Sequence, residues 1–358
     1  MICFIEEKQS GKNVAGPKAR NDVYAILRSY GIQAITLPVV LDMTAQAEKR
    51  SALKKVRDNL VIRNAWKTAL RQTHPGDVVI LQFPILRHPF EVSSLLRKKK
   101  KEGSLFCLFI HYLEILRNFQ DGITVGVKKK LLIREEKQIM DLADFMVVHN
   151  SKMEECLCRM GYDRKKMINL HIFDYLVPDP EKNRTKIRRD YPVIIAGNLN
   201  PAKVGYLAHL PEDVEFNLYG IGYQKQDNSN LHYFGSFTPD ELPGKLQGSF
   251  GLIWDGSSAK TCEGVFGEYL KINNPHKTSL YLASGIPVLV WRQAAIADFV
   301  QEHHCGIVID SLDQIHDILR KLSEEDYKNL VLAAGEVSQQ LAEGYYTRNA
   351  IRELEKHR

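Results

Sequence analysis

Short apolar runs alternate with longer amphipathic stretches through the first half of the chain. Residues 78–83 and 105–111 are almost continuously apolar, and the runs at 2–7, 32–37 and 145–150 share this character. Strands that are covered on both faces have such a composition, because both sets of alternating side chains are buried. The segments between them predict helices near residues 18–30, 45–73, 89–101 and 127–142. The pattern predicts a parallel sheet flanked by helices, which is a doubly wound α/β domain.

A second alternating series follows a change of composition at 177–192, a segment rich in proline and charge. Its apolar runs are 193–196, 215–219, 250–254, 286–291 and 307–310, and residues 323–357 are predicted to be purely helical. We predict an N-terminal domain at 1–176, a linker at 177–192, a C-terminal domain at 193–340 and a C-terminal helix at 341–358. Two such domains place a cleft between the carboxyl ends of their sheets, where doubly wound folds bind ligands.

The composition fits a soluble globular protein with two cores, since 44% of the 358 residues are hydrophobic and 26% are charged. No apolar run approaches the roughly 20 residues that span a bilayer. The N-terminus turns acidic directly after Ile2-Cys3-Phe4-Ile5 and lacks the layout of a signal peptide, so we expect a cytoplasmic protein. The six cysteines show no framework spacing, which favours reduced thiols and predicts no structural metal.

Positive charge is concentrated in two runs, at 97–101 and 128–130, in a chain whose net charge is +6. Such runs are usually solvated helix ends. Contact with anionic lipid head groups is the functional alternative, and it would place the chain peripherally at the inner face of the membrane. Nucleic acid is not expected as a partner, because the sequence has no helix-turn-helix pattern, RNA-binding signature or basic stripe interleaved with aromatic residues.

The strongest local signal for chemistry is the segment 271–288, in which a loop leads into a helix and then into a buried strand. Asn274 is suited to cap this helix and Pro275 to occupy its first position. The free amides at such a helix start attract phosphate, and Lys277 adds a positive charge in the first turn. No acidic residue lies between positions 270 and 298, which suits a diphosphate site. The alternative is that Asn-Pro is only a capping device and Lys277 a surface lysine.

Two glycine-containing loops point to the same cleft. Gly197 ends the first strand of the second domain, where it lets backbone approach a ligand, and Lys203 follows within reach of phosphate or ribose oxygens. Gly16 and Lys18 enter the helix after the first strand of the N-terminal domain and point to an anion in the cleft. Neither loop has the G-x-G-x-x-G fingerprint, and a glycine in such a loop is common for structural reasons alone.

Together these segments resemble a known family. Residues 250–255, followed by 274–288, look like a bacterial glycosyltransferase family that includes the β-1,6-galactofuranosyltransferases of surface polysaccharide synthesis. The same family includes the glucosyltransferases that extend GlcNAc on serine-rich repeat adhesins. The resemblance runs along the whole chain and is strongest over 193–310. It implies a GT-B fold, with two Rossmann-like doubly wound domains facing across a cleft, and inverting, metal-independent transfer from a UDP-sugar.

The resemblance also implies roles for single residues. Lys277 would meet the diphosphate, Asn198 and Lys203 would lie near phosphate or ribose, and Tyr219 would lie near the nucleoside. Gly16 and its neighbours would close over the donor from the other domain. The predicted donor-binding residues are Gly16, Lys18, Gly197, Asn198, Lys203, Tyr219, Asn274, Lys277 and Thr278. No cofactor is expected, since the UDP-sugar is a co-substrate, and the lack of a strict Asp-x-Asp triplet fits transfer without metal.

One departure concerns the catalytic base. Several relatives have His-Asp after the fourth strand of the first domain, whereas this chain has His111-Tyr112. Inverting transfer needs a general base at the acceptor hydroxyl, and His111 and Glu114 are the candidates. The alternative is that His111 is a packed histidine at a strand end and Glu114 a helix cap.

Several functions remain open on the sequence. Galactofuranosyl transfer is favoured, because the Asn-Asn-Pro-His-Lys form of the motif is closer to that branch, and glucosyl transfer to a glycoprotein is the second hypothesis. The acceptor would be a glycan, lipid-linked or carried on a glycoprotein. A non-catalytic protein that binds a nucleotide sugar as partner of another transferase is a third hypothesis, and a GT-B epimerase a fourth. The sequence leaves the oligomeric state open, a homo-oligomer included.

Overall fold

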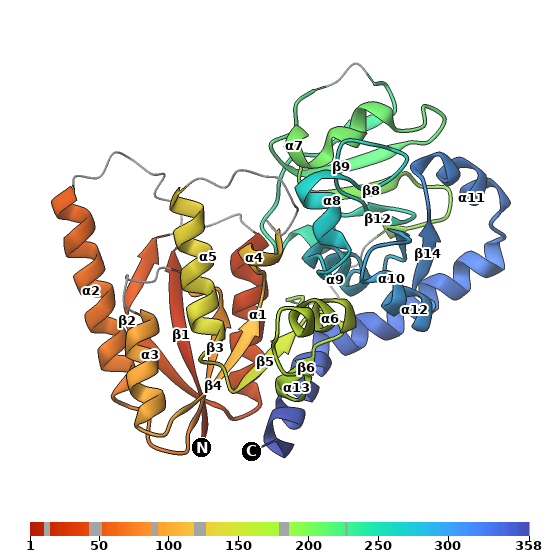
Figure 1. Ribbon diagram of the computed structural model, residues 1–358. Helices are drawn as coiled ribbons and strands as arrows, with labels where there is room; N and C mark the ends of the chain where they lie inside the picture. Colours follow the sequence, from red (N-terminus) through yellow and green to blue (C-terminus); the bar gives the residue numbers. More distant parts are fainter. Residues whose placement is uncertain are drawn as a thin grey trace.

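The computed structural model describes residues 1–10, 15–42, 52–86, 92–117, 127–178, 186–225 and 228–357. Two sheets of six strands each form two lobes, with helices on both faces of each sheet (Figure 1). Every strand pair in these two sheets is parallel. The prediction of two doubly wound α/β domains is confirmed.

The N-terminal sheet has the strand order β2-β1-β3-β4-β5-β6. Its strands are β1 (Ile2–Ser10), β2 (Gln33–Asp42), β3 (Val78–Phe83), β4 (Leu105–Ile110), β5 (Phe145–Val148) and β6 (Met167–Asn169). Its helices are α1 (Ala15–Ser29), α2 (Ala52–Leu70), α3 (Val92–Lys101), α4 (Glu114–Arg117), α5 (Val127–Met140) and α6 (Ser151–Arg159). All six residues of β3 are buried, as their continuous apolar composition predicts.

The C-terminal sheet has the order β10-β9-β8-β12-β13-β14. Its strands are β8 (Val193–Asn198), β9 (Phe216–Ile221), β10 (Leu231–Tyr233), β12 (Gly251–Ile253), β13 (Val288–Trp291) and β14 (Gly306–Ile309). Its helices are α7 (Pro201–Val204), α8 (Gly264–Leu270), α9 (His276–Ala283), α10 (Ala297–Glu302), α11 (Ile315–Lys321) and α12 (Glu324–Glu343). A separate two-residue pair joins β7 (Lys186–Ile187) to β11 (Gln247–Gly248).

Each sheet contains an edge strand that the sequence pattern did not predict. These strands are β6 and β10, and each is three residues long. An edge strand this short carries too few alternations to stand out from a loop. Two of the three residues of β10 are also exposed, so its composition gives no sign of burial.

The last helix returns to the N-terminal domain. Helix α12 ends at Gly344, which has a left-handed backbone (φ 70°), and α13 (Tyr345–Lys356) then packs against α1 and β6 (Figure 1). A Cβ on Gly344 would lie 2.7 Å from Ile26 Cγ1, so glycine also permits the close approach of α1. The buried carboxylate of Asp174 accepts hydrogen bonds from the backbone N–H groups of Tyr346 (3.2 Å) and Thr347 (2.7 Å) in the first turn of α13.

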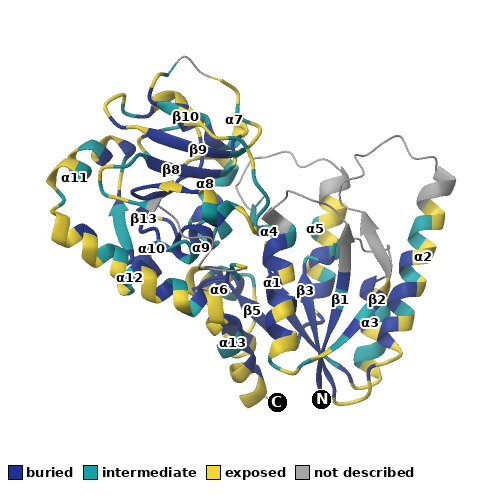
Figure 2. Ribbon diagram, turned by 180° about the vertical axis from the view of Figure 1, so that it is seen from behind, coloured by how far each residue is buried: buried dark blue, intermediate teal, exposed yellow. Residues whose placement is uncertain are grey.

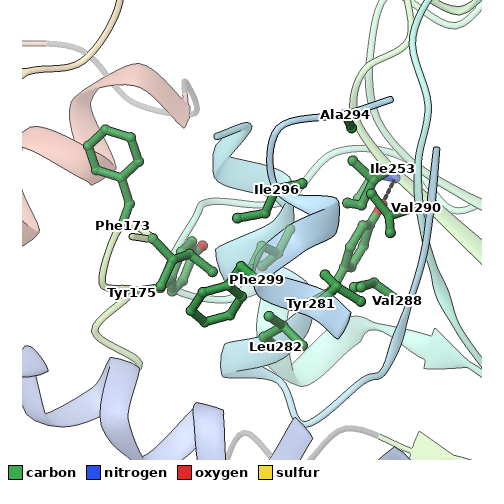
Figure 3. Close-up of a cluster of buried hydrophobic side chains, with 14 of the residues drawn as sticks. Phe173, Tyr175, Ile253, Tyr281, Leu282, Val288, Val290, Ala294, Ile296 and Phe299 are labelled. Carbon is green, nitrogen blue, oxygen red and sulfur yellow. Dashed lines mark hydrogen bonds between the residues drawn. The ribbon is translucent and has the colours of Figure 1, made fainter. Parts of the chain in front are cut away.

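One hydrophobic cluster contains side chains of both domains. It includes Phe4 of β1 as well as the apolar residues of β8, β12 and β13. Phe173 and Tyr175, in the segment after β6, belong to this cluster together with Ile296 and Phe299 of the C-terminal domain, and Figure 3 shows part of it. Figure 2 shows the described central strands of both sheets mostly buried and the outer faces of the helices exposed. Apolar packing therefore holds the two domains against each other.

All six cysteines are free thiols, four of them buried and two, Cys156 and Cys158, partly buried. Among the described residues, no group of three or more His, Cys, Asp and Glu side chains could hold a metal. The same part of the chain contains no helix that is long and apolar enough to cross a membrane.

Two of the five basic residues in the first run are hydrogen-bonded to other parts of the N-terminal domain, and the other three are exposed. Lys99 Nζ donates to the carbonyl of Thr73 (3.1 Å), and Lys100 Nζ donates to Asp144 (2.7 Å). These partners precede β3 and β5, so the run lies at the amino edge of the sheet, whereas Lys130 lies in the first turn of α5 at the opposite, carboxyl edge. The two basic runs therefore do not form one surface.

Candidate functional site

A cavity of about 250 Å³ opens between the domains at the carboxyl ends of the strands. Lys18 of α1 and Tyr175 of the connecting segment line one side. The C-terminal domain supplies the rest of the lining: Ala196, Gly197, Asn198, Tyr219, Gly220, Ile221, Ser236, Phe237, Pro239, Leu242, His276, Lys277 and Leu280. The predicted cleft is thus present, and residues from both domains close it.

Two glycines form the floor of this cavity. Gly197 of β8 (φ 122°) and Gly220 of β9 (φ 147°) are register partners in the parallel pair. A Cβ on Gly220 would lie 1.7 Å from the carbonyl oxygen of Gly197, so no other residue fits there. Asn198 is exposed beside them, and its Oδ1 accepts a hydrogen bond from the backbone N–H of Asn200 (3.0 Å). The floor therefore presents bare backbone to a ligand.

An aromatic wall borders this floor. Tyr219 is buried, and its ring stacks on Phe234 at 5.1 Å with an interplanar angle of 12°. The Tyr219 hydroxyl accepts a hydrogen bond from the backbone N–H of Gln247 (3.2 Å), which fixes the ring. Phe237 lies 6.4 Å from Tyr219 and also lines the cavity. The wall offers apolar ring surface to a planar ligand group.

Two lysines converge on one buried carboxylate next to the cavity. Lys277, in the first turn of α9, donates to Asp255 Oδ1 (2.9 Å) and to the carbonyl of Trp254 (2.8 Å). Lys203 Nζ lies 3.6 Å from Asp255 Oδ2, and burial together with the nearby charge of Lys277 lowers the pKa of Lys203. Two cations against one carboxylate give a locally positive site that can receive an anion.

Asn274 does not cap α9, which corrects the prediction. Pro275 occupies the N-cap position and makes no side-chain hydrogen bond there. The buried Asn274 amide instead donates to the carbonyls of His149 (2.8 Å) and His171 (2.6 Å). Its Oδ1 accepts from Asn150 Nδ2 (2.7 Å). Asn274 thus joins the C-terminal domain to the N-terminal one, and its side chain lies outside the lining of the cavity.

Thr278 also lies outside that lining. Its side chain is fully buried, and its hydroxyl has no hydrogen-bond partner in the described structure. Gly16 lies in the first turn of α1.

Lys18 links the domains across the cavity. Its ammonium donates to Asp22 Oδ1 (2.6 Å) and to the carbonyl of Leu176 (2.5 Å), and it lies 3.1 Å from Asp240 Oδ1 of the C-terminal domain. It also lies 4.9 Å from the centre of the Tyr175 ring. Burial raises the pKa of Asp22 to about 6, although Lys18 opposes this shift. Lys18 is therefore an interdomain ion-pair residue at the rim of the cavity.

His111 follows β4 and is half-buried. Its Nε2 is 2.5 Å from Gln82 Oε1, and its ring stacks on Phe173 at 5.4 Å. Burial lowers the pKa of His111 well below 6.5, and the positive charge of Arg20 adds to the effect. Phe173 in turn lies 6.2 Å from the ring of His276, which lines the cavity. A row of rings thus connects His111 to the cavity.

Glu114 has a different environment. Its carboxylate accepts from Arg117 Nη1 (3.1 Å). The Arg117 guanidinium lies 5.8 Å from the centre of the Tyr269 ring, in the C-terminal domain. Glu114 is therefore engaged in an ion pair at the domain boundary, whereas His111 is neutral.

The structure brings together five of the predicted donor residues in one cavity: Lys18, Gly197, Asn198, Tyr219 and Lys277. Lys203 joins them through Asp255. Sequence reasoning missed Asp255 as the partner of both lysines and Gln82 as the partner of His111. In the sequence, the position of Asp255 directly after a buried strand is the feature that could have indicated a role in the site.

The family models of known proteins match both domains. Residues 2–172 match the N-terminal domain of the Glucosyltransferase 3-like family, and residues 193–354 match its C-terminal domain. The chain is 31% identical over 360 residues to the β-1,6-galactofuranosyltransferase WbbI of Escherichia coli strain K12, covering 99% of this chain and 98% of that protein. It is 24% identical over 334 residues to Glucosyltransferase 3 of Streptococcus gordonii, covering 93% and 92%.

Solved structures share the fold. Sucrose-phosphate synthase from Thermosynechococcus elongatus superposes with a TM-score of 0.65 at 12% identity, covering 100% of this chain and 99% of that one. HepE of Anabaena, in complex with UDP-glucose, superposes with a TM-score of 0.57 at 12% identity, covering 99% of both chains. These likenesses confirm the predicted GT-B fold. The chain is a glycosyltransferase that belongs to the Glucosyltransferase 3-like family.

Proposed function

We propose that this chain transfers a hexose, with galactofuranose favoured, from a UDP-sugar to a glycan acceptor, with inversion and without metal or cofactor. The observation that carries the proposal is the pair of lysines on Asp255, beside a cavity with a bare glycine floor and an aromatic wall. The floor and Tyr219 suit a nucleoside. Lys277 and Lys203 suit a diphosphate, and the start of α9 adds the positive end of a helix dipole.

The same charges serve the reaction. As the bond between the sugar C1 and the diphosphate oxygen breaks, negative charge develops on UDP, and Lys277 and Lys203 stabilise it. Lys18 and Tyr175 face the cavity from the N-terminal side, so closure of the domains excludes water that would hydrolyse the donor.

The acceptor hydroxyl needs a base. Inverting transfer forms the bond between the acceptor oxygen and C1 while the hydroxyl proton passes to that base. Of the two predicted candidates, His111 is neutral, which is the protonation state required of a base, and Glu114 is paired with Arg117. We assign the base to His111.

A transfer assay would identify the donor sugar. Purified protein is incubated with UDP-galactofuranose or UDP-glucose and a panel of glucosyl, galactosyl and GlcNAc acceptors, and products are detected by mass spectrometry. Product from UDP-galactofuranose supports the favoured branch, in keeping with the 31% identity to the E. coli enzyme, and product from UDP-glucose supports the alternative. UDP binding without transfer or donor hydrolysis would favour a non-catalytic role.

Metal independence is tested in the same assay. Because the lysines supply the charge that a divalent cation supplies in other transferases, excess EDTA should leave the rate unchanged. A loss of activity that added Mg²⁺ or Mn²⁺ restores would overturn this part of the proposal.

We also propose that the carboxyl edge of the N-terminal domain contacts an anionic membrane, which would bring the enzyme to lipid-linked acceptors at the inner face of the membrane. Large apolar side chains are exposed in the first halves of α2 (Val56, Leu60, Val61) and α5 (Leu131, Leu132), with basic Arg57, Lys130 and Arg134 also exposed. Both helices begin at the carboxyl edge (Figure 1). Binding to liposomes that contain phosphatidylglycerol should weaken as salt rises. The absence of binding at low salt would contradict it.

A further inference from the structure

Gln82, the fifth residue of β3, is buried directly beside His111. Its side chain is 2% exposed, and β3 and β4 are neighbours in the sheet, so the two residues meet although 29 positions separate them. Its Nε2 donates to the carbonyl of Arg20 (2.9 Å), and its Oε1 lies 2.5 Å from His111 Nε2.

These contacts fix the orientation of the amide. A backbone carbonyl only accepts hydrogen bonds, so the NH₂ group of Gln82 must face Arg20. The amide oxygen then faces His111, and because this oxygen also only accepts, His111 Nε2 must carry a proton. In a neutral imidazole with Nε2–H, the lone pair is on Nδ1. His111 Nδ1 makes no hydrogen bond to any of the described residues.

We propose that Gln82 is a positioning residue that holds His111 in the Nε2–H tautomer, so that Nδ1 accepts the proton of the acceptor hydroxyl. This inference rests on the assignment of His111 as the base. In the transfer step the acceptor O–H bond breaks, its proton goes to Nδ1, the oxygen bonds to the sugar C1, and the electron pair of the C1–O bond leaves with UDP. The proton on Nε2 stays in place throughout.

An amide at position 82 and a carboxylate at the same position would affect the charge of His111 differently. A carboxylate at position 82 would accept the same hydrogen bond and stabilise the imidazolium, which would raise the pKa of His111. The neutral amide orients the ring without this effect. The charged and titratable groups that face His111 are Arg20 of α1, His149 after β5 and His276 of α9, and all three lower its pKa. Tyr112 is the adjacent residue, and the ring face is covered by Phe173.

His149 is held in the same Nε2–H tautomer, by backbone partners on both ring nitrogens. Its Nδ1 accepts from the backbone N–H of Asn274 (3.0 Å), and its Nε2 donates to the carbonyl of Ile110 (3.2 Å). Both of its ring nitrogens are therefore occupied, and burial lowers its pKa to about 4. His111 differs because, among the described residues, only its Nε2 has a hydrogen-bond partner. This difference singles out His111 Nδ1 as a nitrogen available to substrate.

The first test is the pH dependence of kcat/KM for three proteins. In the wild type, activity should stay level on the acid side until the pH falls below 6.5, since the base must be neutral. Gln82→Glu should move this acid limb upward by about one to three pH units, the usual effect of an adjacent carboxylate. Gln72→Glu adds the same charge at an exposed position of the same domain and should leave the profile unchanged.

The second test removes the hydrogen bond without adding charge. Gln82→Met should lower kcat by roughly 10²-fold, the usual effect of a misplaced catalytic group, with an unchanged KM for the UDP-sugar. A change of stability alone would not produce this separation of kcat from KM, nor the shift in pH profile.

Direct observation of the tautomer does not depend on any variant being folded. Long-range ¹H–¹⁵N correlation spectra of the wild type, with His111 assigned by comparison with His111→Ala, should show the proton on Nε2. A proton on Nδ1, or an acid limb that does not move in folded Gln82→Glu, would overturn the inference. Failure of the underlying assignment has a separate signature, because His111→Ala would then still transfer sugar at the wild-type rate.

Discussion

The assignment of the diphosphate site rests on Lys277, and its removal is the sharpest test of the proposed function. In Lys277→Ala the ammonium group that bridges Trp254 and Asp255 is lost, while the α9 backbone remains. Alanine is a strong helix former, so the first turn of α9 should persist. Among the described residues, the buried carboxylate of Asp255 then has Lys203, at 3.6 Å, as its remaining charged partner.

The expected loss follows from the charge. A unit charge about 4 Å from one phosphate charge contributes about 4 kcal/mol at the effective dielectric constant of a partly exposed site. This energy corresponds to roughly 10³-fold in an equilibrium or rate constant. Lys277 is mostly buried, with 12% of its side chain exposed, so solvent screens it only in part. We expect UDP affinity and kcat/KM each to fall by about this factor.

The assay combines calorimetric titration of UDP with the transfer rate. Lys328→Ala, which removes an exposed lysine of α12, should match the wild type in both measurements. The double variant Lys277→Ala/Asp255→Asn should recover part of the affinity, because the carboxylate that would repel the diphosphate is gone. A folded Lys277→Ala variant that remains within threefold of wild-type affinity and rate would show that Lys277 does not bind the diphosphate.

Three further predictions concern the fold of the protein. Gly220→Ala should abolish UDP binding and lower the unfolding midpoint, because its Cβ would overlap the Gly197 carbonyl. As a control, Gly335→Ala, in an open helical position, should instead stabilise the protein by about 0.5–1 kcal/mol. Asn274→Ala removes three interdomain hydrogen bonds and should lower the unfolding free energy in urea by about 3 kcal/mol, and an unchanged value would show that the contact is dispensable. Burial raises the pKa of Asp174 from 3.8 to about 7, so the folded chain holds this proton between about pH 4 and 7 where the unfolded chain has lost it. Stability should therefore fall as pH rises through this interval, and Asp174→Asn should show a smaller fall in urea titrations across it.

The amino-acid sequence alone is sufficient to predict the architecture and most of the donor site. Near-continuous apolar runs such as Val78–Phe83 can only be strands covered on both faces, and their alternation with amphipathic helices gives two doubly wound domains. The carboxyl ends of parallel strands share one edge, so Gly197, Tyr219 and Lys277 had to lie near each other once the strands were known. The residue types and the geometry of parallel sheets are therefore sufficient to predict that these residues lie together.

The hydrogen bonds and ion pairs of the site residues, by contrast, depend on the tertiary structure. Asn274 is a residue type that often caps helices, yet its side chain binds the N-terminal domain, because the buried polar groups of His149 and Asn150 need partners. The carbonyl of the exposed His171 accepts a further hydrogen bond from the same amide. Gln82 lies in an apolar run and gives no sign of function until β3 and β4 pair and bring it against His111. Asp255 likewise becomes the partner of both lysines only when β12, α7 and α9 are packed together. These contacts join residues that are far apart in the sequence. Hydrogen bonds and ion pairs of this kind depend on how the elements pack in three dimensions, which the local sequence pattern does not specify.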